Sequence, residues 1–92
     1  MRRLFIEQDD RHAWIRVEPP LAMNEIQAGL PSVQHGGSEG TEWIPPSVLH
    51  TDHESVIAFE SWVFGASHER LTSYAVGLMH SLHAQVIIDR TE

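Results

Sequence analysis

The fold is decided by residues 55–89, which read SVIAFESWVFGASHERLTSYAVGLMHSLHAQVIID. From Leu71 to Leu82, apolar side chains recur at positions i, i+3, i+4, i+7, i+8 and i+11. This is the spacing of an amphipathic helix, because residues three and four apart share one helix face. The pattern predicts a helix over residues 68–83 that packs its apolar stripe on the rest of the chain.

The segments on either side of this helix are strand-like. Four consecutive apolar residues, Val56–Phe59, predict a strand covered on both faces over residues 55–64. Val86–Ile88 predict a final strand over residues 85–89. A strand, a helix and a strand in this order indicate a crossover between parallel neighbouring strands.

Two further strands are predicted near the N-terminus. Residues 2–8 and 12–18 alternate apolar and polar side chains, and a polar turn, Asp9-Asp10-Arg11, separates them. This arrangement predicts a β-hairpin. The prolines that follow it end the second strand, and Leu21–Leu30 then predicts a short amphipathic helix.

Residues 31–54 contain Gly36-Gly37, Gly40 and Pro45-Pro46, and they predict a long irregular loop within one small acidic domain, residues 1–92. The expected fold is therefore α+β. It consists of a four-stranded sheet, formed by the β-hairpin, short helix, long loop and β-α-β unit, with helices packed mainly on one face.

The composition restricts the function. Thirteen acidic residues face six basic ones, all arginine, so the formal net charge is −7. This charge repels phosphates and disfavours nucleic-acid binding by the whole surface, whereas it favours a basic protein or ribonucleoprotein partner. An acidic balance that serves only solubility explains the charge equally well. Protonation of the seven histidines would cancel the charge, so affinity for a basic partner is expected to weaken from about pH 7 to about pH 5.5.

Cysteine is absent, which excludes disulfides and thiolate chemistry. The chain shows no signal-peptide pattern and no run of apolar residues long enough to cross a membrane, so a cytoplasmic location and no membrane partner are expected.

The acids cluster in predicted turns and loops. If these segments meet at one end of the sheet, they form a single acidic patch for a basic partner. The residues predicted for this patch are Glu7, Asp9, Asp10, Glu39, Glu42, Asp52 and Glu54. Trp43 lies beside acids in the loop, and it is either an aromatic anchor for the partner or a side chain that packs back on the domain.

No motif for catalysis or for a cofactor is present, and no metal site is predicted. His50 and His53 lie three residues apart in the predicted loop, and His80 and His83 have the same spacing on the predicted helix. Neither pair has the spacing and context of a described zinc motif, so solvated imidazoles are favoured over ligands.

These observations favour a non-catalytic acidic inhibitor that occupies the nucleic-acid or substrate surface of a basic, nucleic-acid-handling target. Immunity proteins, antitoxins and phage-type anti-restriction or anti-CRISPR inhibitors belong to this class. The alternative is a His-rich metal-binding protein or metal-dependent hydrolase. Contact between the arginines of the N-terminal hairpin and nucleic acid in a mixed complex stays open.

Overall fold

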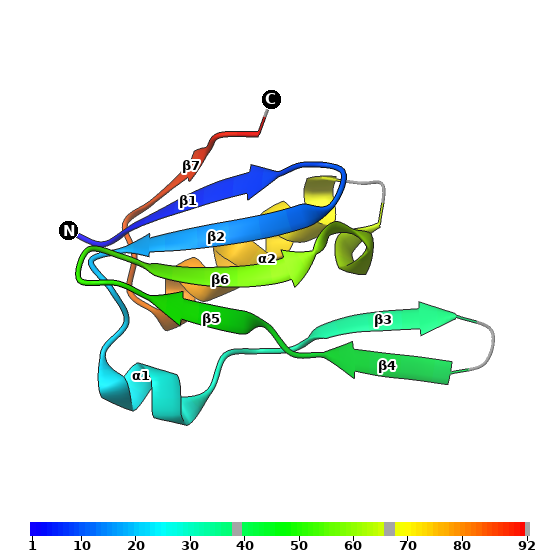
Figure 1. Ribbon diagram of the computed structural model, residues 1–92, viewed down its shortest axis with the longest axis horizontal. Coiled ribbons are helices and arrows are strands. Elements are labelled where there is room, and N and C mark those ends of the chain that lie inside the picture. The colour runs from blue at the N-terminus through cyan, green and yellow to red at the C-terminus, as the bar shows by residue number, and fades with distance from the viewer. Residues whose placement is uncertain (38–39, 66–67, 92) are drawn as a thin grey trace.

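The computed structural model of the 92-residue chain describes residues 1–37, 40–65 and 68–91. Its main sheet is built from β1 (Arg3–Gln8), β2 (His12–Glu18), β5 (Ser47–His50), β6 (Ser55–Glu60) and β7 (Val86–Asp89). The strand order is β5-β6-β2-β1-β7, and the sheet is mixed because β7 runs parallel to β1 whereas the other neighbours are antiparallel (Figure 1). The N-terminal hairpin predicted from alternation is confirmed as β1 and β2.

One face of this sheet is covered by α2 (His68–Ser81), which lies behind the sheet in the view of Figure 1. The predicted stripe is confirmed, since Leu71, Ala75 and Leu78 are buried. They join the alternate residues of β2 and β6 that point to the same side, such as Ile15 and Ile57, in one apolar core. No helix among the described residues is long and apolar enough to cross a bilayer.

The prediction of a four-stranded sheet with helices packed on it is wrong. The sheet has five strands, and α2 is the one main helix that packs on it; α1 (Met23–Ala28) is a single short segment beside β5. The predicted crossover is also wrong in its neighbours, because β7 pairs with β1 and the hairpin separates it from β6. Strand order depends on contacts between segments distant in sequence, which local patterns do not reveal.

The prediction of an irregular loop over residues 31–54 is wrong as well. This segment forms β3 (Val33–Gly37) and β4 (Gly40–Ile44), which pair as a separate two-stranded sheet, and then the edge strand β5. The β3–β4 hairpin extends beyond the main sheet in Figure 1. Its base is held by α2, since Arg70 Nη2 donates to Gln34 O at 2.6 Å and Tyr74 Oη donates to Pro31 O at 2.7 Å.

The predicted strand over residues 55–64 is shorter than expected. It ends at Glu60, and residues Ser61–Phe64 form a 3-10 turn, η1. Gly65 ends this turn with φ of +73°, a left-handed conformation that glycine adopts without a Cβ clash. The turn keeps Val63 and Phe64 in the core and leaves Trp62 at the surface, beside the end of β6.

Candidate binding groove on the open face of the sheet

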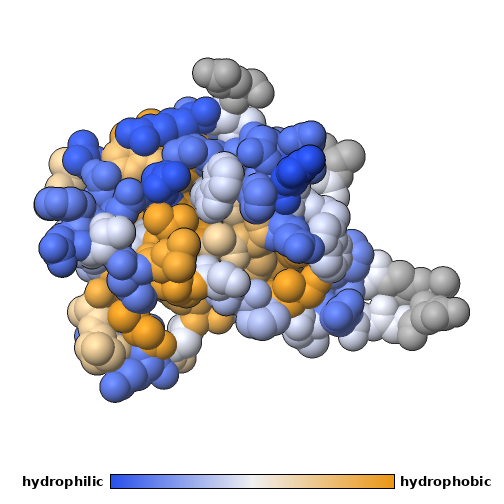
Figure 2. Space-filling view, viewed as in Figure 1, coloured by the Kyte–Doolittle hydropathy of each residue, from blue (hydrophilic) through white to orange (hydrophobic). Residues whose placement is uncertain are grey.

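Among the described elements, no helix covers the face of the main sheet opposite α2, which faces the viewer in Figure 1. Because side chains alternate along strands, this open face receives Phe5, Arg16 and Val56, which lie side by side in register across β1, β2 and β6. Figure 2 shows apolar side chains among hydrophilic ones across this view. Two groups of residues occupy the open face, one toward each end of the strands.

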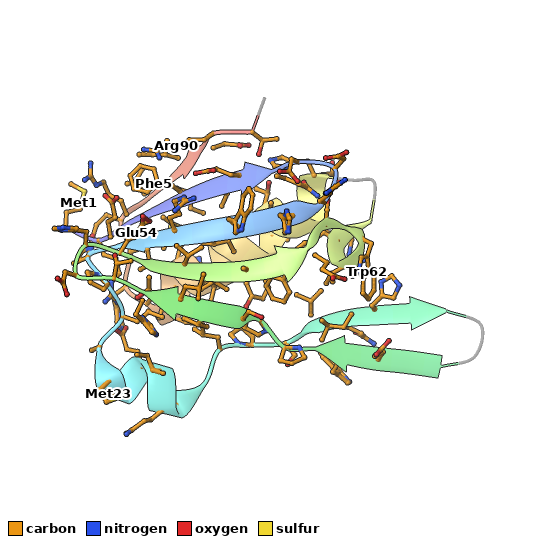
Figure 3. The ribbon with its side chains drawn as sticks, viewed as in Figure 1. Met1, Phe5, Met23, Glu54, Trp62 and Arg90 are labelled. Atoms are coloured by element: carbon orange, nitrogen blue, oxygen red, sulfur yellow. The ribbon has the colours of Figure 1, made fainter. Side chains whose placement is uncertain are left out.

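The first group, termed the arginine cluster, consists of Arg3, Phe5, Glu7, Arg16, Glu54 and Arg90. Arg16 donates from Nε to Glu7 at 2.9 Å and from Nη1 to both Glu54 carboxylate oxygens at 3.2 Å. The Arg90 guanidinium lies 4.1 Å from the centre of the Phe5 ring, an arrangement that Figure 3 shows near the top of the sheet. Phe5 is consequently only 3 % exposed although no helix covers it.

Charges in the arginine cluster satisfy one another. Burial opposes the charge of Arg16, but its hydrogen bonds to Glu54 and Glu7 outweigh this effect and raise its pKa. Arg90 lies 4.0 Å from the same Glu7 oxygen that Arg16 contacts. The carboxylates of Glu7 and Glu54 are therefore already paired with arginines of the same chain, and these contacts point to a structural role.

The second group surrounds a groove of about 320 Å³ at the other end of the open face, termed the aromatic groove. Its lining includes Ala58 of β6 together with His12, Ile44, Pro45, Glu60 and Trp62. They come from β2, the end of β4 and the connection that follows it, the end of β6, and η1. Trp62 is 51 % exposed, and Figure 3 places it at the end of the sheet above the β3–β4 hairpin.

Ring contacts hold the two sides of the aromatic groove. The His12 ring stacks on Trp14 with centroids 5.1 Å apart, and the His35 ring meets Trp62 edge to face at 5.0 Å. Trp62 Nε1 donates a hydrogen bond to the Glu60 carboxylate. Ser61 N donates to Arg11 O at 2.8 Å, so the β1–β2 turn is fastened to the same end of the sheet.

The predicted acids do not gather at a single end. Asp9 and Asp10 form the β1–β2 turn beside Glu60, whereas Asp52 and Glu54 form the β5–β6 turn before Ser55. The length of β6 separates these turns, about 17 Å at roughly 3.4 Å per residue. Glu7 and Glu54 belong to the arginine cluster, and Glu39 lies outside the described residues.

The hairpin carries two of the predicted partner residues. Trp43 is 62 % exposed on β4, so the alternative in which it packs back on the domain is not what the structure shows. Glu42 pairs in register with His35 and shares its face of the hairpin. Because His35 contacts Trp62, this face is the one directed toward η1 and the aromatic groove.

The histidines proposed as alternative ligands lie in different environments. His50 Nδ1 is 2.7 Å from Ser55 Oγ, and His53 is exposed in the β5–β6 turn. His80 lies on α2, with His83 just beyond the end of that helix. Within residues 1–37, 40–65 and 68–91, no group of three or more potential ligands is placed to hold a metal ion.

The Ser55–His50 contact resembles the nucleophile and base of a hydrolase, but its location differs. Ser55 is 0 % exposed, and its Oγ also accepts a hydrogen bond from Leu21 N at 2.8 Å. The hydroxyl therefore fastens the chain between β2 and α1 to the sheet, where no substrate reaches it.

Three arginines of the N-terminal hairpin are used inside the protein. Arg2 binds both carboxylate oxygens of Glu25, at 2.6 and 2.9 Å, and Arg3 and Arg16 contact acids on the open face. Arg11 is exposed in the turn. The hairpin consequently offers little free positive charge to a nucleic acid.

Sequence reasoning missed Glu60 and Trp62 as members of a site. Both fall within the strand predicted over residues 55–64, where an aromatic residue is expected to pack on the sheet. The polar pair Glu60-Ser61, which interrupts the apolar run, was the one signal that the strand ends there. A comparison with known proteins finds no family model, no curated protein and no solved structure that matches this chain.

Proposed function

We propose that this protein is a non-catalytic acidic inhibitor that acts in the cytoplasm by binding a basic, nucleic-acid-handling protein or ribonucleoprotein. The observation that carries the proposal is the position of the exposed aromatic side chains. Among the described residues, the exposed large aromatics are Trp43 and Trp62, on the β3–β4 hairpin and on η1 against which the hairpin lies. Exposed tryptophans are typical anchors of protein interfaces.

Charge at the same end supports a basic partner. Asp10 and Glu42 are exposed, and within the part of the chain that the structure describes neither forms an ion pair. The arginine cluster neutralises Glu7 and Glu54, whereas Asp52 is exposed in the turn at the far end. A basic partner that docks on Trp62 can therefore meet the exposed carboxylates of Asp10 and Glu42 at the same end.

A non-catalytic role is supported by the burial of the Ser55–His50 contact, the one serine–histidine contact among the described residues. Ser55 Oγ has no exposed surface, and both of its contacts are internal. An inhibitor of this kind needs only a surface that competes with nucleic acid or substrate for a basic cleft. Phage-type, antitoxin and immunity-type inhibitors share this requirement, and the identity of the captured partner distinguishes among them.

The test compares charge reversals at the two ends of the sheet. Partners are captured from host lysate at low salt and identified by mass spectrometry, and association rates are measured for wild type, Asp10→Lys, Glu42→Lys and Asp52→Lys. Asp52→Lys is the matched control, because Asp52 is also exposed but lies at the opposite end. We expect Asp10→Lys and Glu42→Lys together to slow association about tenfold, and Asp52→Lys to change it less than about twofold.

If all three reversals slowed association equally, the partner would be attracted by the overall negative charge of the protein and not by a local surface. Capture of no basic protein would remove the support for an inhibitor. Elemental analysis of untagged protein covers the metal-binding alternative, for which stoichiometric zinc, manganese or nickel is the positive result.

A further inference from the structure

We propose that the aromatic groove is a receptor for an arginine side chain of the basic partner, an inference that rests on the proposed function and specifies its chemistry. The volume of about 320 Å³ lies at the lower end of the range for small-molecule sites, and it suits one long side chain better than a cofactor. The groove lies on the face that no helix covers, so a side chain can enter it directly from a docked surface.

The walls provide two kinds of attraction for a cation. Trp62 and the His12 ring, which is stacked on Trp14, both line the groove with aromatic surface, and a cation over an aromatic face is attracted by the ring quadrupole. Glu60 adds a carboxylate at the same position. Its hydrogen bond from Trp62 occupies one oxygen, and an ionised carboxylate has further acceptor sites for a partner.

The apolar part of the groove fits the stem of the side chain. Ile44 and Pro45 form one wall, and Ala58 leaves the floor low because its side chain is small. Long basic side chains bury their methylene groups along such surfaces while the charged head stays near acceptors. Covering the exposed indole of Trp62 in this way removes apolar surface from water.

Arginine is favoured over lysine by the geometry of the guanidinium. This group is planar, weakly hydrated and able to stack on a ring while donating to a carboxylate in its own plane. The protein already uses this arrangement on the same face, where Arg90 stacks on Phe5 at 4.1 Å and lies 4.0 Å from Glu7. The aromatic groove has the ring and the carboxylate, Trp62 and Glu60, and lacks only the guanidinium.

A nucleobase could also stack on Trp62, but the surrounding charge opposes it. Asp9 and Asp10 lie in the turn fastened to η1, and Glu60 is part of the groove itself. Phosphates that accompany a base would meet these carboxylates, whereas proteins that bind single strands surround their aromatic platforms with positive charge. A nucleotide is therefore the negative probe in the experiment.

The experiment titrates ¹⁵N-labelled protein with N-acetyl-arginine N-methylamide and follows the Trp62 indole N–H and the Ala58 amide. N-acetyl-norleucine N-methylamide serves as the uncharged analogue, and adenosine monophosphate serves as the nucleotide. We expect the arginine probe to shift both signals saturably and to bind about threefold or more tightly than the norleucine probe. The nucleotide is expected to leave both signals unchanged.

Three variants localise the effect. Glu60→Gln keeps the shape of the side chain but removes its charge, and we expect it to weaken arginine binding about two- to fivefold. Ala58→Leu fills the floor and should abolish the shifts. Met23→Ala is the control, since Met23 is exposed on α1 and lies outside the groove lining, so its removal should leave the probe affinity unchanged. The amide spectrum of each variant establishes that it is folded.

Equal binding of the arginine and norleucine probes, or binding of the nucleotide instead, would overturn the inference. The two proposals fail separately. Capture of a basic partner that binds Ala58→Leu and Glu60→Gln as tightly as wild type overturns the groove assignment and leaves the inhibitor function standing. Saturable arginine binding without any basic partner supports the groove and overturns the inhibitor function.

Discussion

The two ends of the open sheet face differ in how they treat an aromatic ring: one end buries the ring, and the other leaves it exposed. Both ends place an aromatic ring on a face that no helix covers. At the arginine cluster, Phe5 is buried beneath Arg90 and beside Arg16, and the acids around it are paired. At the aromatic groove, Trp62 remains half exposed and its nearest acid, Glu60, is bonded to the indole and to no arginine among the described residues.

The difference separates stability from binding. A ring that is covered by its own chain stabilises the fold through the burial of its whole apolar surface. The ion pairs around it are partly shielded from water, so solvent weakens their attraction less than that of fully exposed pairs. A ring left exposed contributes little to folding but keeps its surface for another molecule. Acid content alone did not reveal this distinction, because Glu7 and Glu54 have the same chemistry as Asp10 and Glu42 and differ only in the presence of a neighbouring arginine.

The largest expected effect comes from removing the two rings. Phe5→Ala should lower the free energy of unfolding by about 3–5 kcal/mol, since it empties a buried position. Trp62→Ala should lower it by less than about 1 kcal/mol, because half of the side chain already faces solvent. Urea unfolding of both variants measures the difference, and similar losses would contradict the division of the open face into a structural end and a binding end.

A smaller loss is expected from breaking the ion pairs of the arginine cluster. Arg16→Ala leaves Glu7 and Glu54 without their shared donor, and we expect a loss of about 2 kcal/mol, reduced by the solvent that reaches these groups. Arg11→Ala is the matched control in the exposed turn, with an expected change within about 0.5 kcal/mol. Thermal unfolding compares the two, and an Arg11→Ala effect as large as that of Arg16→Ala would contradict the assignment of the cluster.

Periodicity in the sequence predicted the elements that bury one face. Residues 68–83 and 12–18 have clear helical and alternating patterns, because every third or fourth residue, or every second one, contacts the core. The hairpin of β3 and β4 escaped prediction because its residues are mostly exposed and thus carry no such pattern. Glycines at its tip and prolines after it are equally typical of loops.

The site was less predictable than the fold. The aromatic groove depends on two long-range contacts, since His12 lies opposite Glu60 and Ser61 N is bonded to Arg11 O. It also depends on a local change, because the chain leaves the strand at Ser61 and places Trp62 on η1. The predicted patch assumed that loops with acids meet at one end. The direction of β6 instead carries Asp52 and Glu54 to the far end of the sheet, and strand direction is set by pairing that a single sequence does not show.

Acids that are paired with arginines also make the stability of the protein depend on pH. The hydrogen bond from Arg2 lowers the pKa of Glu25, against the opposing effect of burial, and the Ala22 backbone N–H lowers it further. A carboxyl group whose pKa is lower in the folded state stabilises the protein at pH values above its unfolded pKa of 4.5, and this contribution is lost as the pH falls through the folded pKa.

Glu25→Gln should therefore destabilise the protein at neutral pH, and its stability should match that of wild type more closely in acid. Urea unfolding between about pH 7 and about pH 3 measures this convergence. A difference between Glu25→Gln and wild type that does not vary with pH would contradict this role of the Arg2 contact.

The smallest expected effect distinguishes two adjacent acids at the groove end. Asp9 Oδ1 accepts hydrogen bonds from Arg11 N at 2.8 Å and His12 N at 2.7 Å, and these bonds lower the pKa of Asp9. Asp9 therefore shapes the turn, whereas Asp10 is exposed beside it. Asp9→Ala should lower the Tm at neutral pH, and Asp9→Asn should retain most of it because the amide oxygen still accepts these bonds. Asp10→Ala should leave the Tm unchanged but slow association with a basic partner. If Asp10→Ala instead lowered the Tm as much as Asp9→Ala, Asp10 would be part of the turn's structure, and the binding surface would have to be built from Glu42 and Glu60 without it.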